Sequence, residues 1–211
     1  TAIDLRGHGA SSHAAPYDMA TMAGDVGTVL EVEGISDALL VGHSLGGAVV
    51  SAYAAGGSCR GVVNVDQPLA LSGFQDALGQ LRPMLQGDAA SFRGAIGAMF
   101  DQMSGALVGS QRQRVDAIRS PDQGVVLGIW EMLFDSSAEE LDATVDAMSG
   151  AITVPYLSVH GIDPGPGYPA WLTERIPTAL VEVWPDLGHY PHLVEQQRFV
   201  DRVIEFDRSL T

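Results

Sequence analysis

A serine flanked by glycines is the most distinctive chemical feature of the sequence. Residues 41–47 read Val-Gly-His-Ser-Leu-Gly-Gly, so Ser44 lies in the pattern Gly-x-Ser-x-Gly. The preceding residues favour a strand and the small residues that follow favour a helix. Glycine on both sides leaves room for a cramped strand-to-helix turn that exposes the serine hydroxyl, while the helix N-terminus faces developing negative charge. The pattern therefore predicts a nucleophilic serine.

A serine hydroxyl is a poor nucleophile unless a base takes its proton and an acid fixes the tautomer of that base. Among the six histidines we favour His189, which lies in a loop after the last predicted strand and follows Gly188. His43 is next to Ser44 and we expect it to pack or hydrogen-bond behind the turn, or alternatively to contact substrate. For the acid we favour Asp163, because the Pro- and Gly-rich loop 161–167 has a fixed shape. Asp66, at the end of another predicted strand, is the alternative.

Strand and helix signals alternate along most of the chain. Such alternation indicates an α/β fold, a mostly parallel sheet with helices on both faces. The expected strands are Thr1–Leu5, Ala38–Gly42, Gly61–Asp66, Thr153–His160 and Ala179–Trp184. The segment 67–150 interrupts this rhythm with helical patterns, among them one that Asp88 caps and one that opens with a capping box at Ser137. We therefore divide the chain into a discontinuous core, 1–66 and 151–211, and a helical cap, 67–150.

Methionine and aromatic side chains are concentrated in the predicted cap. They include Met99 and Trp130, which we expect to contact substrate as part of an adaptable apolar wall. The alternative for any one of them is packing between the cap helices and the sheet.

Composition excludes several classes of chemistry. The 211 residues include 26 acidic and 11 basic side chains, a net charge of −15, and every basic residue is arginine. Without lysine there is no P-loop lysine, Schiff base or Ser-Lys dyad. A single cysteine, Cys59, excludes an internal disulfide and a multi-cysteine metal site. The acidity argues against nucleic acid and anionic membranes as partners. The uncharged run 38–59 is too rich in glycine for a spanning helix, so we expect no membrane insertion and a cytoplasmic protein.

The chain resembles the α/β-hydrolase fold family, in its serine-nucleophile, capped, esterase- or lipase-like branch. Segments Asp4–Gly9, Gly42–Gly46, His160–Asp163 and Gly188–His189 match in the family's order, and the resemblance extends to about Phe206 outside the cap. It implies Ser44 as nucleophile, His189 as general base and acid, and Asp163 as the orienting acid. It also implies the Leu45 backbone N–H as one oxyanion donor. No metal or organic cofactor is implied.

One feature of the family is missing from the sequence. Members have a strand and a loop before the Asp4–Gly9 segment, and that loop supplies the second oxyanion donor. The missing strand would lie between Thr1–Leu5 and Ala38–Gly42, so its absence would leave buried backbone groups unpaired. We therefore expect an N-terminal segment that this sequence lacks, or a second chain, to complete the sheet and the oxyanion hole.

The working hypothesis is a serine hydrolase that transfers the acyl group of a small, ester-like substrate to water through an acyl-enzyme. Lactone hydrolysis, C–C bond hydrolysis and acyl transfer remain open on this fold. Two other classes are also open. One is a cofactor-free oxidoreductase of the haloperoxidase or dioxygenase type. The other is a ligand-binding protein that keeps the triad residues but has no enzymatic activity.

Overall fold

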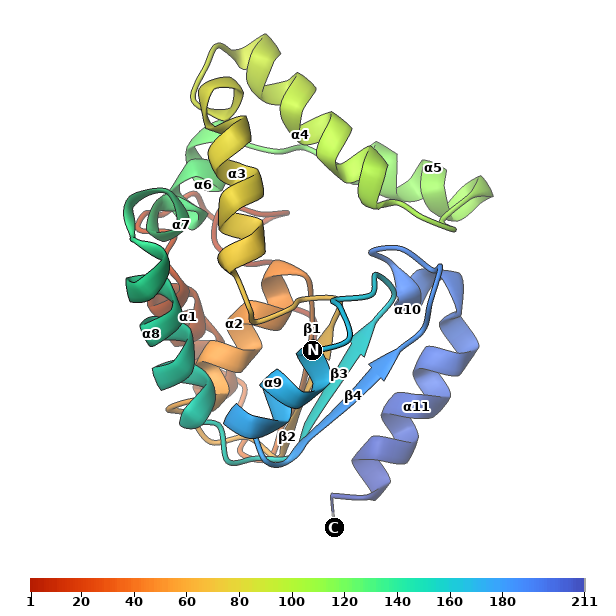
Figure 1. The fold of residues 1–211 in the computed structure, drawn as a ribbon. Coiled ribbons are helices and arrows are strands. Elements are labelled where there is room, and N and C mark those ends of the chain that lie inside the picture. The colour runs from red at the N-terminus through yellow and green to blue at the C-terminus, as the bar shows by residue number, and fades with distance from the viewer. Residues whose placement is uncertain (211) are drawn as a thin grey trace.

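A parallel sheet of four strands organises the molecule. The computed structural model describes residues 1–210. Its strands are β1 (Leu39–His43), β2 (Gly61–Val65), β3 (Tyr156–His160) and β4 (Ala179–Val183), and they lie in the order β1-β2-β3-β4 (Figure 1). Every neighbouring pair is parallel, so each connection must return across a face of the sheet. This confirms the predicted α/β class with a mostly parallel sheet.

Helices cover both faces of this sheet. On one face, α1 (Met19–Val32), α2 (Leu45–Ala54) and α9 (Tyr168–Arg175) contribute to the largest hydrophobic cluster. On the other face, α11 (Gln196–Arg208) contributes Phe206 to a second cluster. The two central strands are buried along their whole length, which explains why they are nearly continuous apolar runs in the sequence.

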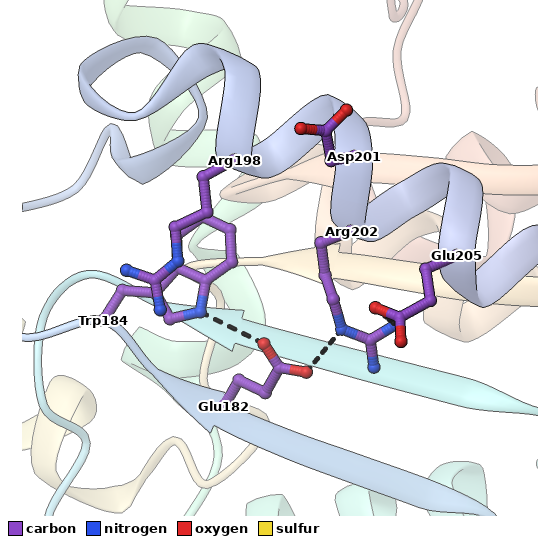
Figure 2. A pocket seen from close by; sticks show the side chains of 6 residues that line it. All are labelled: Glu182, Trp184, Arg198, Asp201, Arg202 and Glu205. Atoms are coloured by element: carbon purple, nitrogen blue, oxygen red, sulfur yellow. Dashed lines mark hydrogen bonds and ion pairs between the residues drawn. The ribbon is translucent and has the colours of Figure 1, made fainter.

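Charged and aromatic side chains connect α11 to the edge strand β4. Glu182 accepts a hydrogen bond from the Trp184 indole at 3.1 Å and one from the Arg202 guanidinium at 2.6 Å (Figure 2). The Arg198 guanidinium lies 4.0 Å from the centre of the Trp184 ring. These contacts line a surface hollow of about 740 Å³ beside α11. Because Glu182 and Arg202 are paired with each other, we interpret the residues that line this hollow as contacts that attach α11 to the sheet.

A helical insertion separates β2 from β3 and stands over the carboxyl ends of the strands (Figure 1). Its core cluster is distinct from those of the sheet and includes Leu78, Phe92 and Leu141. The predicted caps are confirmed, because Asp88 accepts from the Ser91 N–H and Ser137 forms a capping box with Glu140. The helices are α3 (Ser72–Leu85), α4 (Ala89–Met103), α5 (Gly109–Ile118), α6 (Gln123–Ile129), α7 (Glu131–Asp135) and α8 (Ala138–Gly150).

One expected strand does not form. Thr1–Leu5 has no regular structure, and residues 1–4 are exposed. A strand is stabilised by pairing with a neighbour, and within residues 1–210 no strand pairs with the outer edge of β1. The other four expected strands form, and β3 begins at Tyr156 instead of Thr153. None of the helices described in residues 1–210 is both long and apolar enough to cross a bilayer.

A buried hydrogen-bond network ties α2 to the two central strands. The Tyr156 hydroxyl lies 2.7 Å from the Ser51 hydroxyl, and it accepts from the Asn64 amide at 2.8 Å. All three residues are fully buried. Buried polar groups of this kind stabilise a fold only while they remain paired.

We expect Tyr156→Phe to lower the free energy of unfolding by about 1–2 kcal/mol, because two buried polar groups lose a partner. Urea denaturation followed by circular dichroism measures this change. Tyr53→Phe is the matched control, because the Tyr53 hydroxyl makes a single exposed bond to the Ser58 carbonyl. It should change the unfolding free energy by less than about 0.5 kcal/mol. Equal effects of the two substitutions would contradict a stabilising role for the network.

Candidate active site

The ends of two adjacent strands bring Ser44 and Asp66 side by side. His43 pairs with Val65 in the sheet register, so the next residue of each strand leaves at the same edge. The Ser44 N–H donates to the Val65 carbonyl at 2.9 Å. Both Ser44 and Asp66 adopt left-handed backbone conformations, with φ of 53° and 54°. This conformation is uncommon outside glycine and is often found at functional sites.

The turn around Ser44 requires glycine at its close contacts. A Cβ atom on Gly42 would overlap the backbone of Gly46, and one on Gly47 would overlap the Asn64 side chain. Immediately after Ser44, α2 begins at Leu45. The first turn of an α-helix has N–H groups without intrahelical acceptors, so the Leu45 N–H is available to stabilise an oxyanion. The predicted strand–turn–helix context of Ser44 is therefore present.

His189 is paired with Asp66. Its Nδ1 lies 2.6 Å from Oδ2 of Asp66, and both side chains are almost completely buried. The other carboxylate oxygen, Oδ1, accepts from the backbone N–H groups of Gly161 at 2.7 Å and Ile162 at 3.0 Å. Because the carboxylate only accepts, Nδ1 of His189 carries the proton, and Nε2 is left as the basic nitrogen.

Hydrogen bonding keeps Asp66 ionised in spite of its burial. Burial by itself raises the pKa of the carboxyl, but the bonds from His189, Ile162 and Gly161 oppose it, and the net pKa lies below the usual value. The ionised carboxylate holds Nδ1–H of His189 and leaves Nε2 as the acceptor nitrogen. The pair can therefore take up a proton from a neighbouring hydroxyl.

Asp163 does not contact His189, contrary to the sequence-based expectation. It is exposed, and its Oδ1 accepts from the Gly165 N–H at 2.8 Å within its own loop. The two carboxylates differ in where they leave their strands, because Asp66 directly follows β2 and is buried, whereas Asp163 is the third residue after β3 and is exposed. In the geometry of this site Asp66, the alternative acid, replaces Asp163.

His43 supports the backbone of His189, a partner that no local sequence pattern indicated. Its Nε2 donates to the His189 carbonyl at 2.6 Å, and the two rings are 4.6 Å apart. Burial, together with the neighbouring His189 and His192, lowers the pKa of His43 to about 3. His43 is therefore a neutral donor at ordinary pH. Its ring makes a hydrogen bond within the site, and its contact with substrate stays a prediction.

Met99 and Trp130 pack inside the helical insertion. Both are partly buried against the core cluster of the insertion, and Trp130 makes an edge contact with Phe74 at 5.9 Å. These neighbours correspond to the packing alternative for each residue, while contact with substrate stays a prediction. Within residues 1–210 no three His, Cys, Asp or Glu side chains gather as a metal site.

A largely apolar hollow of about 750 Å³ opens beside Ser44. It extends from the turn along the outer edge of β1, where Val41 is 47% exposed. Residues 1–5 and the inner side of α1 also line it, and its apolar lining includes Ile3, Leu5, Val26, Leu40 and Leu45. The Ser44 hydroxyl makes no hydrogen bond to any part of the chain that the structure describes. It can therefore turn toward a ligand or a base.

The model of the Alpha/beta hydrolase family matches residues 1–202. The chain belongs to the alpha/beta hydrolase family. Among curated proteins, a non-heme chloroperoxidase from Burkholderia pyrrocinia is 29% identical over 185 residues, which are 77% of this chain. This chain covers 63% of that relative's length.

Solved structures of other alpha/beta hydrolases share the fold. The esterase RhEst1 from Rhodococcus sp. ECU1013 superposes with a TM-score of 0.67 at 25% identity, over 99% of this chain and 79% of its own. Est816, described as an N-acyl homoserine lactone degrading enzyme, gives a TM-score of 0.72 at 22% identity, over 97% and 81%. The latter likeness shows the fold alone.

We expect Asp66→Asn to lower ester turnover by about 10³–10⁴-fold, because the amide would favour the wrong tautomer of His189 and would not stabilise its protonated form. Asp163→Asn is the matched control and should stay within about twofold, because Asp163 contacts only its own loop. Initial rates with p-nitrophenyl acetate measure both variants. A large loss in Asp163→Asn with little change in Asp66→Asn would reverse the assignment.

Stability should fall as the pH drops from about 6.5 toward 4. Burial lowers the pKa of His43 to about 3 and the pKa values of His160 and His192 to about 4. Below pH 6.5 the unfolded chain binds protons on these residues that the folded chain does not. Each therefore removes about 1.4 kcal/mol of unfolding free energy per pH unit until its folded pKa is reached.

Urea unfolding at pH 7.5, 6.5, 5.5 and 5.0 measures this slope. His160→Gln should make the slope of unfolding free energy against pH shallower, because glutamine does not titrate. This expectation holds whatever the variant's stability at pH 7.5. His13→Gln, at an exposed position, should leave it unchanged. A flat profile from pH 6.5 to 5.0 would count against neutral, buried imidazoles.

Proposed function

We propose that this chain is a serine hydrolase that cleaves ester-like acyl substrates. The observation that carries the proposal is the buried pair of His189 and Asp66, at 2.6 Å, beside the left-handed turn of Ser44. A base, an orienting acid and a hydroxyl beside a helix N-terminus are the components of acyl transfer through a covalent intermediate.

In this mechanism, Ser44 Oγ attacks the carbonyl carbon while Nε2 of His189 takes the hydroxyl proton. The carbonyl oxygen gains the electron pair and accepts from the Leu45 N–H. When the tetrahedral intermediate collapses, His189 returns the proton to the leaving alcohol and an acyl-enzyme remains. A water molecule then loses a proton to His189 and attacks the acyl carbon, and Ser44 leaves with that proton. Asp66 stays ionised throughout and stabilises the imidazolium.

Proton transfer requires the Ser44 hydroxyl to approach Nε2 of His189, and catalytic hydrogen bonds of this kind often form only once substrate is bound. The ring of His43, which directly precedes Ser44, is 4.6 Å from the His189 ring. The imidazole of His189 therefore contacts the residue that directly precedes the nucleophile.

We infer that the second oxyanion donor comes from a segment that pairs with the outer edge of β1. That edge is unpaired within residues 1–210, and it continues into the hollow beside Ser44. A neighbouring N-terminal segment or a second chain would bring a backbone N–H to the oxyanion. Loss of one such donor typically costs about 10²–10³ in turnover, so turnover should depend on this pairing.

The apolar side chains of the helical insertion and the absence of lysine favour a small or medium, uncharged acyl substrate. Two structural neighbours are described as an esterase and as a lactone-degrading enzyme, which is compatible with this substrate class. A cofactor-free oxidoreductase is a second candidate, because a non-heme chloroperoxidase is 29% identical over 185 residues. In that case His189 and Asp66 would carry the acid–base chemistry.

Labelling with a fluorophosphonate probe, followed by peptide mapping, tests the proposal. We expect the probe on Ser44, and we expect labelling to fall by at least about 10³-fold in His189→Ala, because the hydroxyl then lacks its base. Ser44→Ala should abolish hydrolysis of p-nitrophenyl acetate. An unlabelled but folded protein would contradict a hydrolase, and halide peroxidation that survives Ser44→Ala would favour the oxidoreductase.

A further inference from the structure

The helical insertion is joined to the loop that carries His189. The His189 N–H donates to the Met103 carbonyl at 2.8 Å, and the Ala106 N–H donates to the Leu187 carbonyl at 3.3 Å. Met103 is the last residue of α4, and α5 follows a few residues later. The bend between these two helices is therefore bonded to the backbone of the proposed base.

Two glycines allow this close approach. Gly105 in the insertion and Gly188 in the loop have φ of 53° and 74°, a conformation that favours glycine. A Cβ atom on Gly105 would overlap the backbone of Gly188, and one on Gly188 would lie 2.6 Å from Cα of Gly105. Real Cβ atoms do not approach other atoms so closely, so each position excludes a side chain because of the other.

We propose that the bend between α4 and α5 positions His189. The base is then aligned only while the insertion is packed against the loop that carries it. The inference rests on the proposed role of His189 as base. In this arrangement Met103 and Gly105 are positioning residues, and neither has to contact the substrate.

His189 is held at three points by three different parts of the chain. Its N–H is bonded to Met103 of the insertion, its carbonyl to His43 beside the nucleophile, and its ring to Asp66 at the end of β2. The second and third supports belong to the sheet core, whereas the first belongs to the insertion. Displacement of the insertion would therefore shift the backbone that aims Nε2, and misplacement of about 1 Å can cost about 10²-fold in rate.

The chain offers a matched pair of variants, Gly105→Ala and Gly109→Ala. Gly105 lies in the connection between α4 and α5, and Gly109 is the first residue of α5. Both have positive φ, of 53° and 59°, but a Cβ atom on Gly109 meets nothing within 4 Å. Both substitutions therefore introduce backbone strain, and only Gly105→Ala forces the insertion away from Gly188. We expect Gly105→Ala to lower kcat for p-nitrophenyl acetate by at least about tenfold, with less than about a threefold change in KM. Gly109→Ala should stay within about twofold in both constants.

Hydrogen–deuterium exchange separates local release from a failure to fold. In Gly105→Ala, the peptide that contains the His189 amide should exchange at least about tenfold faster, while peptides of β2 and β3 keep the wild-type rate. Faster exchange throughout the core, or kcat and His189 exchange equal to those of Gly109→Ala, would overturn the proposal.

A separate outcome tests the underlying function. If His189→Ala keeps full ester turnover, the proposed hydrolase mechanism fails. The exchange measurement would then still report whether the insertion holds the loop.

Discussion

The carboxylate of Asp66 is the contact on which the arrangement of the site depends. One of its oxygens accepts from the His189 ring, and the other accepts from the N–H groups of Gly161 and Ile162. It therefore joins the end of β2 to the loop after β3 and to the loop after β4. A buried charge is tolerated only when its hydrogen-bonding capacity is filled. Here one of the hydrogen bonds that fill it also fixes the ring of His189. Loss of this one group would leave an imidazole and two N–H groups without their acceptor.

Parallel strands explain why these groups meet. Their carboxyl ends lie at one edge, so turns that are distant in sequence become neighbours in space. The site does not belong to the sheet alone, because the insertion binds the backbone of His189 through Met103. Rigid strands fix Ser44 and Asp66, whereas His189 lies on a loop whose support comes partly from helices outside the sheet. In the proposed mechanism, the residue that transfers protons is thus also the one whose support extends furthest from the core.

Local sequence patterns predicted the parts of the molecule that local physics determines. The turn at Ser44 follows from glycine spacing, and the caps at Asp88 and Ser137 follow from side-chain-to-backbone bonds within one helical turn. The fold class followed from the alternation of strands and helices and from the resemblance to the family. Thr1–Leu5 has strand-like residues but no strand beside it, so its local preference is not realised.

Contacts across the sheet could not be predicted from local sequence patterns. Asp66 and Asp163 both follow strands, but Asp66 is the first residue after β2 and is buried, whereas Asp163 is the third residue after β3 and is exposed. The composition of the loop around Asp163 carries no information about which of the two carboxylates reaches His189. The bond from His43 to the His189 carbonyl joins residues 146 positions apart. The contact between Gly105 and Gly188 likewise has no signal in either local segment.

The position of Asp66 changes the demands on the loop after β3. In this geometry, segment 163–167 no longer has to hold a carboxylate at a fixed point, because the two N–H groups that Asp66 uses belong to Gly161 and Ile162, before the prolines. Insertions, deletions and exchanges of residues in that segment should therefore disturb the site less than changes at Gly161 and Ile162. The same stretch offers an attachment point for a tag or an inserted peptide close to the active site.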